Sequence, residues 1–248
     1  MNAAPRSIAA MAAVIVIAVA GFAILRPSGS GVGGGPPQTP SISPPSPTPS
    51  PSPLTYRWPM TLPAGTYATD FTWDVPIVVT FTVPDGWQSR DIEVIRDPVV
   101  SIAFALVGNV YADPCEHTLK DPPIGPSVDD LAAALSQLPG VDATTPASVT
   151  FSGYRGKYLE FSVREDIACR SGDFRYWEDP PNAHSPGATP LGPPYFWAER
   201  RQNRIWILDI DSVRYVIDAL TSPNATAADL AELQAVIDSI RIEPKTVP

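Results

Sequence analysis

The segment Ile205–Leu220, IWILDIDSVRYVIDAL, is the strongest indication of the fold that we predict for this chain. Its first four residues are all apolar, which is typical of a strand that is buried on both faces at the centre of a sheet. Asp211 and Ser212 form a turn pair, and a second apolar-rich stretch begins at Val213. The segment therefore predicts a β-hairpin at the core of the domain.

Further strands are predicted where apolar residues recur at every second position, the pattern of half-buried antiparallel strands. Four stretches show this pattern: 77–83, 100–106, 148–152 and 158–163. The last two are separated by the glycine-containing sequence SGYRG, residues 152–156, which reads as a hairpin loop.

Two helices have clear starting signals. Ser127 is followed three residues later by Asp130, and Thr226 by Asp229, and both pairs resemble capping boxes. Each is followed by a stripe of apolar residues, namely Leu131, Leu135 and Leu138 in the first helix and Leu230, Leu233, Ile237 and Ile240 in the second. Because strands outnumber helices and follow one another as hairpins, we predict an α+β domain, an antiparallel sheet with packed helices.

The N-terminus carries an uncharged apolar run from Ile8 to Leu25. As a helix its 18 residues would span about 27 Å, close to the ~30 Å hydrocarbon core of a bilayer. We therefore predict that residues 1–26 form one transmembrane signal-anchor. The alternative is a signal peptide, which would be cleaved after Ala20 or Ala23.

Residues 27–53 are rich in Pro, Ser and Gly and carry no charge, so they cannot bury enough apolar surface to fold. We predict a disordered linker here, extended where proline dominates. Residues 54–248 are long enough for one globular domain, which we predict to be extracytoplasmic. The expected location is the cell membrane, in single-pass form, with the C-terminal domain outside the cytoplasm.

Charge and cysteine content restrict the partners and the compartment. The net charge is −9 and the first 53 residues contain no acid, so the domain is strongly acidic, which argues against nucleic acid as a partner. The two cysteines, Cys115 and Cys169, are predicted to form a disulfide, as an even pair in an exported domain usually does. A metal site or a catalytic thiol is the alternative, but only His117 lies nearby in the sequence, and we predict no metal and no cofactor.

Several short motifs carry a family resemblance. They are PAGTY at 63–67, VTFTVPDGW at 79–87, DPC at 113–115, residues 127–140, GYRG at 153–156, WILDID at 206–211 and residues 232–241. Together they resemble a group of uncharacterised exported, membrane-anchored bacterial domains of the GC-rich Gram-positive type. The strand that leads into PDGW and the C-terminal helix are also similar to the Mog1/PsbP-like fold. Family members usually have Asp-Gly where this chain has Asp211-Ser212, and neither resemblance implies an activity.

The segment Phe174–Arg204 is the candidate binding site. A stretch this long between predicted elements is often functional. It combines aromatic rings with arginines in an acidic domain, and such groups stack on sugars or capture anions. The residues predicted to bind a ligand are Tyr176, Trp177, Trp197, Arg200, Arg201 and Arg204. The alternative is that the rings fill the core and the arginines are solvated.

The predicted function is a membrane-anchored sensing or ligand-binding module without catalysis, whose ligand is a small molecule, a glycan or a protein. No catalytic residue is predicted, because His117 and His184 lie in loops and no nucleophile elbow is present. Two alternatives stay open. One is an envelope glycan hydrolase with paired carboxylates, for which Glu165–Asp166 and Asp209–Asp211 are candidates. The other is a structural or assembly partner of the cell envelope.

Overall fold

The hairpin predicted around Asp211 is present in the computed structural model and joins β14 (Gln202–Ile210) to β15 (Val213–Thr221). The structure describes residues 50–54, 60–69, 75–90, 92–96, 99–170, 172–180 and 201–245. The chain divides into the units Met1–Pro47 and Thr48–Pro248, and all described residues belong to the second. None of the helices in these ranges has the length and apolar character needed to cross a membrane. The predicted span at Ile8–Leu25 lies outside the described residues.

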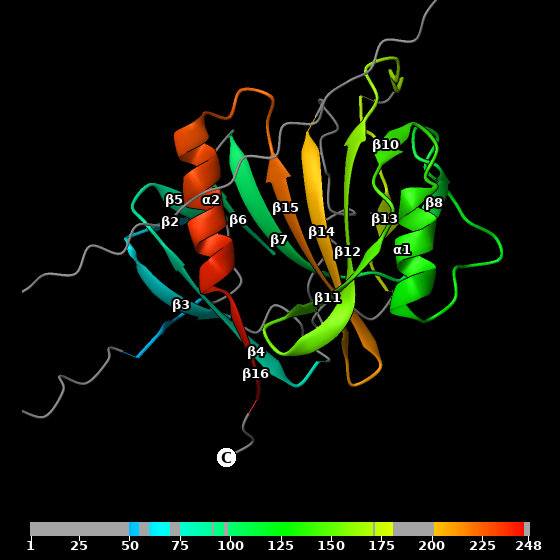
Figure 1. Cartoon of the computed structure of the whole chain (residues 1–248). Helices are drawn as coiled ribbons and strands as arrows, with labels where there is room; N and C mark the ends of the chain where they lie inside the picture. The colour runs from blue at the N-terminus through cyan, green and yellow to red at the C-terminus, as the bar shows by residue number, and fades with distance from the viewer. Residues whose placement is uncertain are drawn as a thin grey trace, which may run out of the picture. The chain divides into compact units, whose positions relative to one another are not determined.

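Three sheets organise the described residues (Figure 1). The largest has nine strands in the order β10–β12–β14–β15–β7–β6–β5–β2, with β11 also paired to β12. Besides β14 and β15, its strands are β2 (Met60–Leu62), β5 (Trp87–Arg90), β6 (Glu93–Arg96), β7 (Val100–Leu106), β10 (Val141–Ala143), β11 (Ala147–Phe151) and β12 (Tyr154–Val163). All of its pairings are antiparallel.

Two smaller sheets complete the architecture. One has the order β1 (Ser52–Pro53), β3 (Gly65–Thr69), β4 (Ile77–Val83) and β16 (Arg241–Pro244). Its β1–β3 pairing is parallel. The other has the order β13 (Trp177–Glu178), β8 (Asn109–Asp113) and β9 (Thr118–Leu119). The two residues of β1 come from the end of the predicted linker, so the last part of that linker is paired into the domain.

The predicted α+β class is wrong. Strands account for 50% of the described residues, whereas two helices account for only 14%, so the domain is mostly β-sheet. The prediction overlooked the short strands, many of which have only two to five residues. Such strands are too short for an alternating pattern to stand out from the turns around them.

The two helices cover opposite faces of the large sheet (Figure 1). Alternate residues of a strand point to opposite faces, so the packing partners along β7 identify the face that each helix covers. Leu233 of α2 (Ala227–Ser239) belongs to the core that contains Phe104. Leu131 of α1 (Val128–Ser136) belongs to the core that contains Ala103. The even-numbered side of β7 therefore faces α2 and the odd-numbered side faces α1.

Both helices begin at the predicted capping boxes, Ser127–Asp130 and Thr226–Asp229. The apolar stripe predicted for α2 is only partly correct, because Leu230 is 43% exposed. Strand β7 also differs from its prediction as a half-buried strand. It is buried on both faces, since its odd-numbered positions hold small residues that pack on the α1 side.

The predicted disulfide between Cys115 and Cys169 is confirmed, with their Cα atoms 4.9 Å apart. It ties the turn after β8 to the loop after β12. Because disulfides persist in oxidising compartments, the bridge indicates an extracytoplasmic domain.

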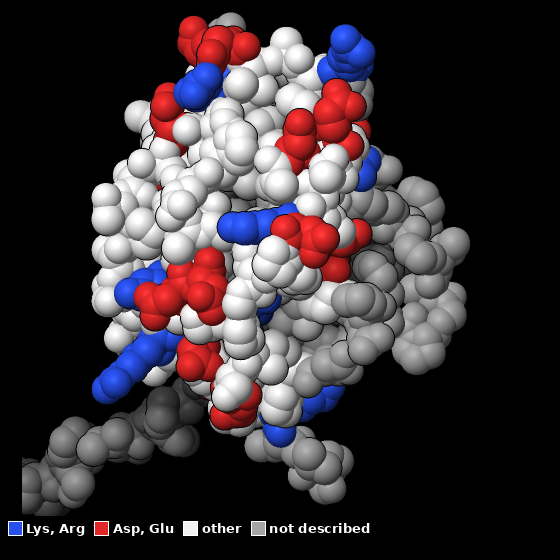
Figure 2. Space-filling view, turned by 90° about the vertical axis from the view of Figure 1, so that its right-hand side faces the viewer, with Lys and Arg blue, Asp and Glu red and all other residues white. Residues whose placement is uncertain are grey.

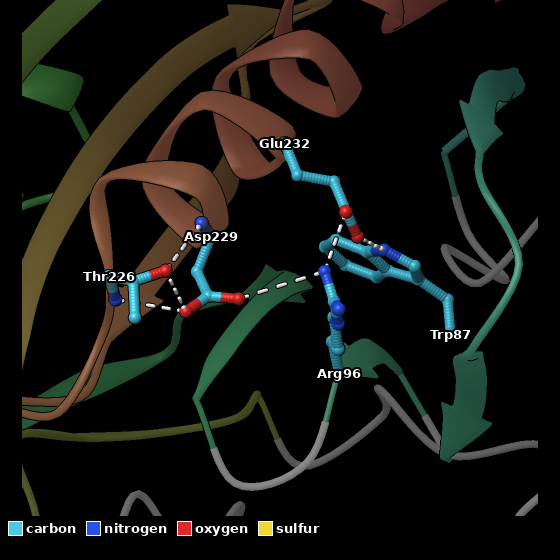
Figure 3. A network of polar contacts seen from close by, with 5 residues as sticks. All are labelled: Trp87, Arg96, Thr226, Asp229 and Glu232. Atoms are coloured by element: carbon cyan, nitrogen blue, oxygen red, sulfur yellow. Dashed lines mark hydrogen bonds and ion pairs between the residues drawn. The ribbon is translucent and has the colours of Figure 1, made fainter.

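A network of hydrogen bonds and ion pairs connects α2 to the strands β5 and β6 (Figure 3). Glu232 accepts a hydrogen bond of 2.6 Å from the indole Nε1 of Trp87 and one of 2.5 Å from Arg96 Nη1. Arg96 Nη1 also lies 3.6 Å from Asp229 Oδ1. Trp87 is fully buried, so Glu232 supplies the acceptor that its indole N–H needs within the protein.

We expect Glu232→Ala to lower the free energy of unfolding by about 1–3 kcal/mol, because it leaves the buried Trp87 N–H without an acceptor. Glu232→Gln keeps an acceptor oxygen and should cost less. Urea denaturation measures both, with Glu243→Ala on the exposed face of β16 as the control. An unfolding free energy for Glu232→Ala within about 0.5 kcal/mol of wild type would contradict this role. Substitutions at ordinary surface positions usually change the unfolding free energy by no more than that.

Candidate functional site

A row of polar and aromatic side chains runs along the α2 face of β12 and β14. The strand register places Tyr158 opposite Trp206 and Glu160 opposite Arg204. The next pair in the same register is Ser162 opposite Gln202, so the row continues toward the start of β14. All six residues occupy even-numbered positions on paired strands and therefore point to one face of the sheet.

Three rings form the centre of this row. The ring centroid of Trp206 lies 5.0 Å from that of Tyr158 and 5.5 Å from that of Phe151 on β11. Trp206 is 9% exposed, whereas Tyr158 and Phe151 are half-buried. These distances fall within the range of favourable aromatic pairing. We refer to Phe151, Tyr158 and Trp206, together with Glu160 and Arg204, as the aromatic surface.

Arg204 connects the aromatic surface to α2. Its guanidinium carbon lies 6.0 Å from the ring centroid of Trp206, at the limit of a cation–π contact. Its Nη1 donates a hydrogen bond of 2.8 Å to Gln234 Oε1, and the amide of Gln234 donates one of 2.8 Å to Asp238. These bonds hold the arginine beside the rings, and its other N–H groups donate no hydrogen bond to the described residues.

Glu160 is the acceptor on this surface. It accepts hydrogen bonds from the hydroxyl of Tyr158 and, at 3.0 Å, from Gln202 Nε2. Burial, followed by the hydrogen bond to Glu160, raises the pKa of Tyr158 above its ordinary value. The tyrosine therefore remains protonated and donates to the carboxylate at physiological pH.

A second polar group lies on the opposite face of the sheet and is fully buried. The carboxylate of Asp218 on β15 accepts a hydrogen bond of 2.9 Å from the hydroxyl of Tyr176. Asn203 Nδ2 donates to both carboxylate oxygens, at 3.0 and 3.1 Å, and to the tyrosine oxygen at 3.0 Å. Burial raises the pKa of Asp218 to about 7, although these hydrogen bonds act in the opposite direction. We call Tyr176, Asn203 and Asp218 the buried triad.

The predicted ligand-binding residues that the structure describes do not form one site. Tyr176 belongs to the buried triad, and Trp177 is 1% exposed in the core beneath α1. The prediction that Trp177 binds a ligand is therefore wrong, because its ring packs against Tyr176 and other core residues, as the alternative had it. Trp197 and Arg200 lie outside the described residues.

The two remaining arginines also separate. The charge of Arg201 acts on Asp218 of the buried triad, in the direction that lowers its pKa. Arg204 instead lies on the aromatic surface. Residues next to each other in a strand point to opposite faces, which separates Asn203 of the triad from Arg204.

Four residues of the aromatic surface were not predicted as site residues: Phe151, Tyr158, Glu160 and Trp206. The alternation in 158–163 correctly assigned Tyr158 and Glu160 to the side opposite the core of Leu159 and Phe161. That signal marked them as accessible, but it could not reveal that β14 would place Trp206 and Arg204 beside them.

The alternative carboxylate pairs have other partners. Asp209 accepts a hydrogen bond of 3.0 Å from the backbone N–H of Ser212 and so stabilises the hairpin turn. Asp166 pairs with Arg164 at 2.7 Å on the exposed surface. Across the described parts of the chain, no three His, Cys, Asp or Glu residues are grouped so that they could hold a metal ion.

Charge on the face that carries α1 and β8 is mixed (Figure 2). Acidic and basic side chains lie in small groups there, and the described residues of this face form no continuous basic patch.

No family model matches the sequence, and a search of curated proteins finds no significant match. The resemblance to exported bacterial domains and to the Mog1/PsbP-like fold therefore stays a prediction.

Proposed function

We propose that this protein is an extracytoplasmic ligand-binding module that holds its ligand on the aromatic surface and does not catalyse a reaction. The observation that carries the proposal is the contact of Trp206 with Tyr158, Phe151 and Arg204 on one face of the sheet. Binding sites commonly combine such rings with a few oriented polar groups.

The polar groups of this surface suit binding better than catalysis. Both oxygens of Glu160 accept hydrogen bonds from neighbouring side chains, so the carboxylate is held in one orientation. A hydrolytic pair would need a general acid with a raised pKa. Asp218 has a carboxyl group with such a pKa, but it is fully buried on the other face of the sheet.

We expect Arg204→Ala to weaken ligand binding at least tenfold, because hydrogen bonds to a charged group contribute about 1.5–3 kcal/mol. The measurement is co-sedimentation of the detergent-solubilised full-length protein with a detergent-extracted cell-envelope fraction from the producing organism. Arg164→Ala is the matched control, since Arg164 is an exposed arginine with a single carboxylate partner. Equal sedimentation of wild type and Arg204→Ala, with unchanged melting temperatures, would refute binding at this surface.

We also propose that the domain is tethered to the cell membrane by the apolar run at Ile8–Leu25, in single-pass form. Support comes from the uncharged length of the run, from the proline-rich stretch that follows it and from the disulfide. Protease treatment of intact cells should release a soluble fragment that begins near Leu54. A mature N-terminus at residues 21–27 would instead establish a cleaved signal peptide, and a fully protected domain would exclude external exposure.

A further inference from the structure

The aromatic surface carries a mixture of hydrogen-bonding groups that restricts the chemistry of its ligand. The guanidinium of Arg204 only donates, and the carboxylate of Glu160 only accepts. Gln202 and Gln234 are exposed amides that can do both, and each is already bonded to one of these charged groups. A matching ligand therefore needs groups that donate and accept at closely spaced positions.

Two carboxylates lie near the guanidinium of Arg204. Glu160 lies directly opposite Arg204 in the strand pairing, and Asp238 follows one hydrogen bond further along, through Gln234. An anionic ligand that approached Arg204 would meet these carboxylates in a protein whose net charge is already −9. The surface is therefore better suited to an uncharged ligand than to a phosphate or an acidic polymer.

The rings supply the apolar part of the contact. Phe151 and Tyr158 flank Trp206 at 5.5 and 5.0 Å between centroids, so they form one continuous apolar area beside the polar groups. A pyranose ring has an apolar C–H face and a rim of hydroxyls, each of which both donates and accepts. A proline-rich peptide would also stack on such rings, but it offers mainly carbonyl acceptors and would supply no donor of its own to Glu160.

Building on the proposed function, we infer that the ligand is a neutral glycan whose pyranose rings stack on Phe151 and Tyr158 while its hydroxyls bond to Glu160 and Arg204. Glu160 accepts from one hydroxyl and Arg204 donates to another. Trp206 packs against these two rings on the side away from the ligand, which agrees with its small exposed fraction of 9%.

The test uses the full-length protein in detergent micelles and isothermal titration calorimetry. The probes are neutral oligosaccharides of glucose, mannose and N-acetylglucosamine, an oligogalacturonate as the acidic glycan, and a decaproline peptide. We expect saturable binding of at least one neutral oligosaccharide. Arg204→Ala and Glu160→Gln should each weaken it at least tenfold, whereas Arg164→Ala should stay within twofold of wild type.

The outcomes separate this inference from the proposed function. Binding of oligogalacturonate or decaproline alone, weakened by Arg204→Ala, would overturn the neutral glycan but keep ligand binding at this surface. Failure of every neutral oligosaccharide to bind at 10 mM would also overturn the inference. The co-sedimentation experiment with the cell-envelope fraction would then still test whether the aromatic surface binds a ligand. Neutral glycan binding that is insensitive to both variants in folded protein would overturn the site itself.

Discussion

Replacing both Cys115 and Cys169 by serine should lower the free energy of unfolding by about 4 kcal/mol. The bridge closes a loop with a sequence separation of 54 residues. A chain-entropy estimate for a loop of this length gives about 4 kcal/mol, and removing native disulfides from small secreted domains costs about 2–5 kcal/mol. This is a large part of the total stability of a typical domain, which is about 5–15 kcal/mol.

The position of the bridge gives a reason to expect a local effect as well. Phe174, Tyr176 and Trp177 follow Cys169 closely and pack in the core beneath α1. Loss of the bridge frees the segment that delivers these three rings to the core. We therefore expect that loss of the bridge accelerates backbone hydrogen exchange in residues 172–178 more than in the hairpin of β14 and β15.

Chemical denaturation of the double-serine variant at constant pH measures the global effect. Wild-type protein treated with a thiol reductant is the matched control, because it loses the same bond without any change of sequence. A double variant that unfolds within 1 kcal/mol of the oxidised wild type would show that the bridge does not stabilise the fold.

Asp218→Asn should remove a pH dependence of stability between about pH 4 and pH 7. The pKa of Asp218 is raised to about 7 in the folded protein by burial, whereas an unfolded aspartate titrates near 3.9. Between these two values the folded state binds more protons than the unfolded state. This group therefore stabilises the fold most below pH 4, and its contribution falls as the pH rises toward 7.

The size of the effect follows from the shift. Each pKa unit corresponds to about 1.36 kcal/mol, so a shift of about three units gives an upper value of about 4 kcal/mol across the window. Above pH 7 the penalty of the buried charge is complete and no longer changes. Asparagine has nearly the same shape and no charge, so the variant should gain stability relative to wild type as the pH rises.

Urea denaturation of both proteins at pH 4, 5, 6, 7 and 8 tests this expectation. Other carboxylates contribute equally to both proteins, so the difference between the two curves isolates Asp218. Parallel curves would show that the pKa of Asp218 is not raised in the folded protein. If the variant does not fold, infrared titration of the buried carboxyl band in the wild type gives the pKa directly.

Local chemistry was enough to predict several features of this domain from its sequence. The turn at Asp211–Ser212 is one, because both residues adopt positive φ angles, 51° and 68°, as a tight hairpin turn requires. The two capping boxes are another, since they depend on side chains only three residues apart. The disulfide prediction followed from there being two cysteines in a chain whose N-terminal sequence predicts export.

Long-range pairing decided the rest. The aromatic surface exists because the register of β12 on β14 places Tyr158 beside Trp206 and Glu160 beside Arg204. These residues are 44 to 48 positions apart in the sequence, and one residue of slippage would turn each strand's side chains to the other face. Periodicity gives the direction of a side chain relative to its own strand, but it does not identify the neighbouring strand.

The same limit explains two of the predictions that failed. Trp177 was expected to bind a ligand because aromatic rings and arginines are concentrated in one long stretch, yet its strand pairs with β8 and its ring enters the core. The α+β class was expected because helix caps are conspicuous and short strands are not. The turns and helix caps could be located from the residues alone, since those interactions are local. Which side chains meet depends on the folded arrangement, because burial and register involve elements that are distant along the chain.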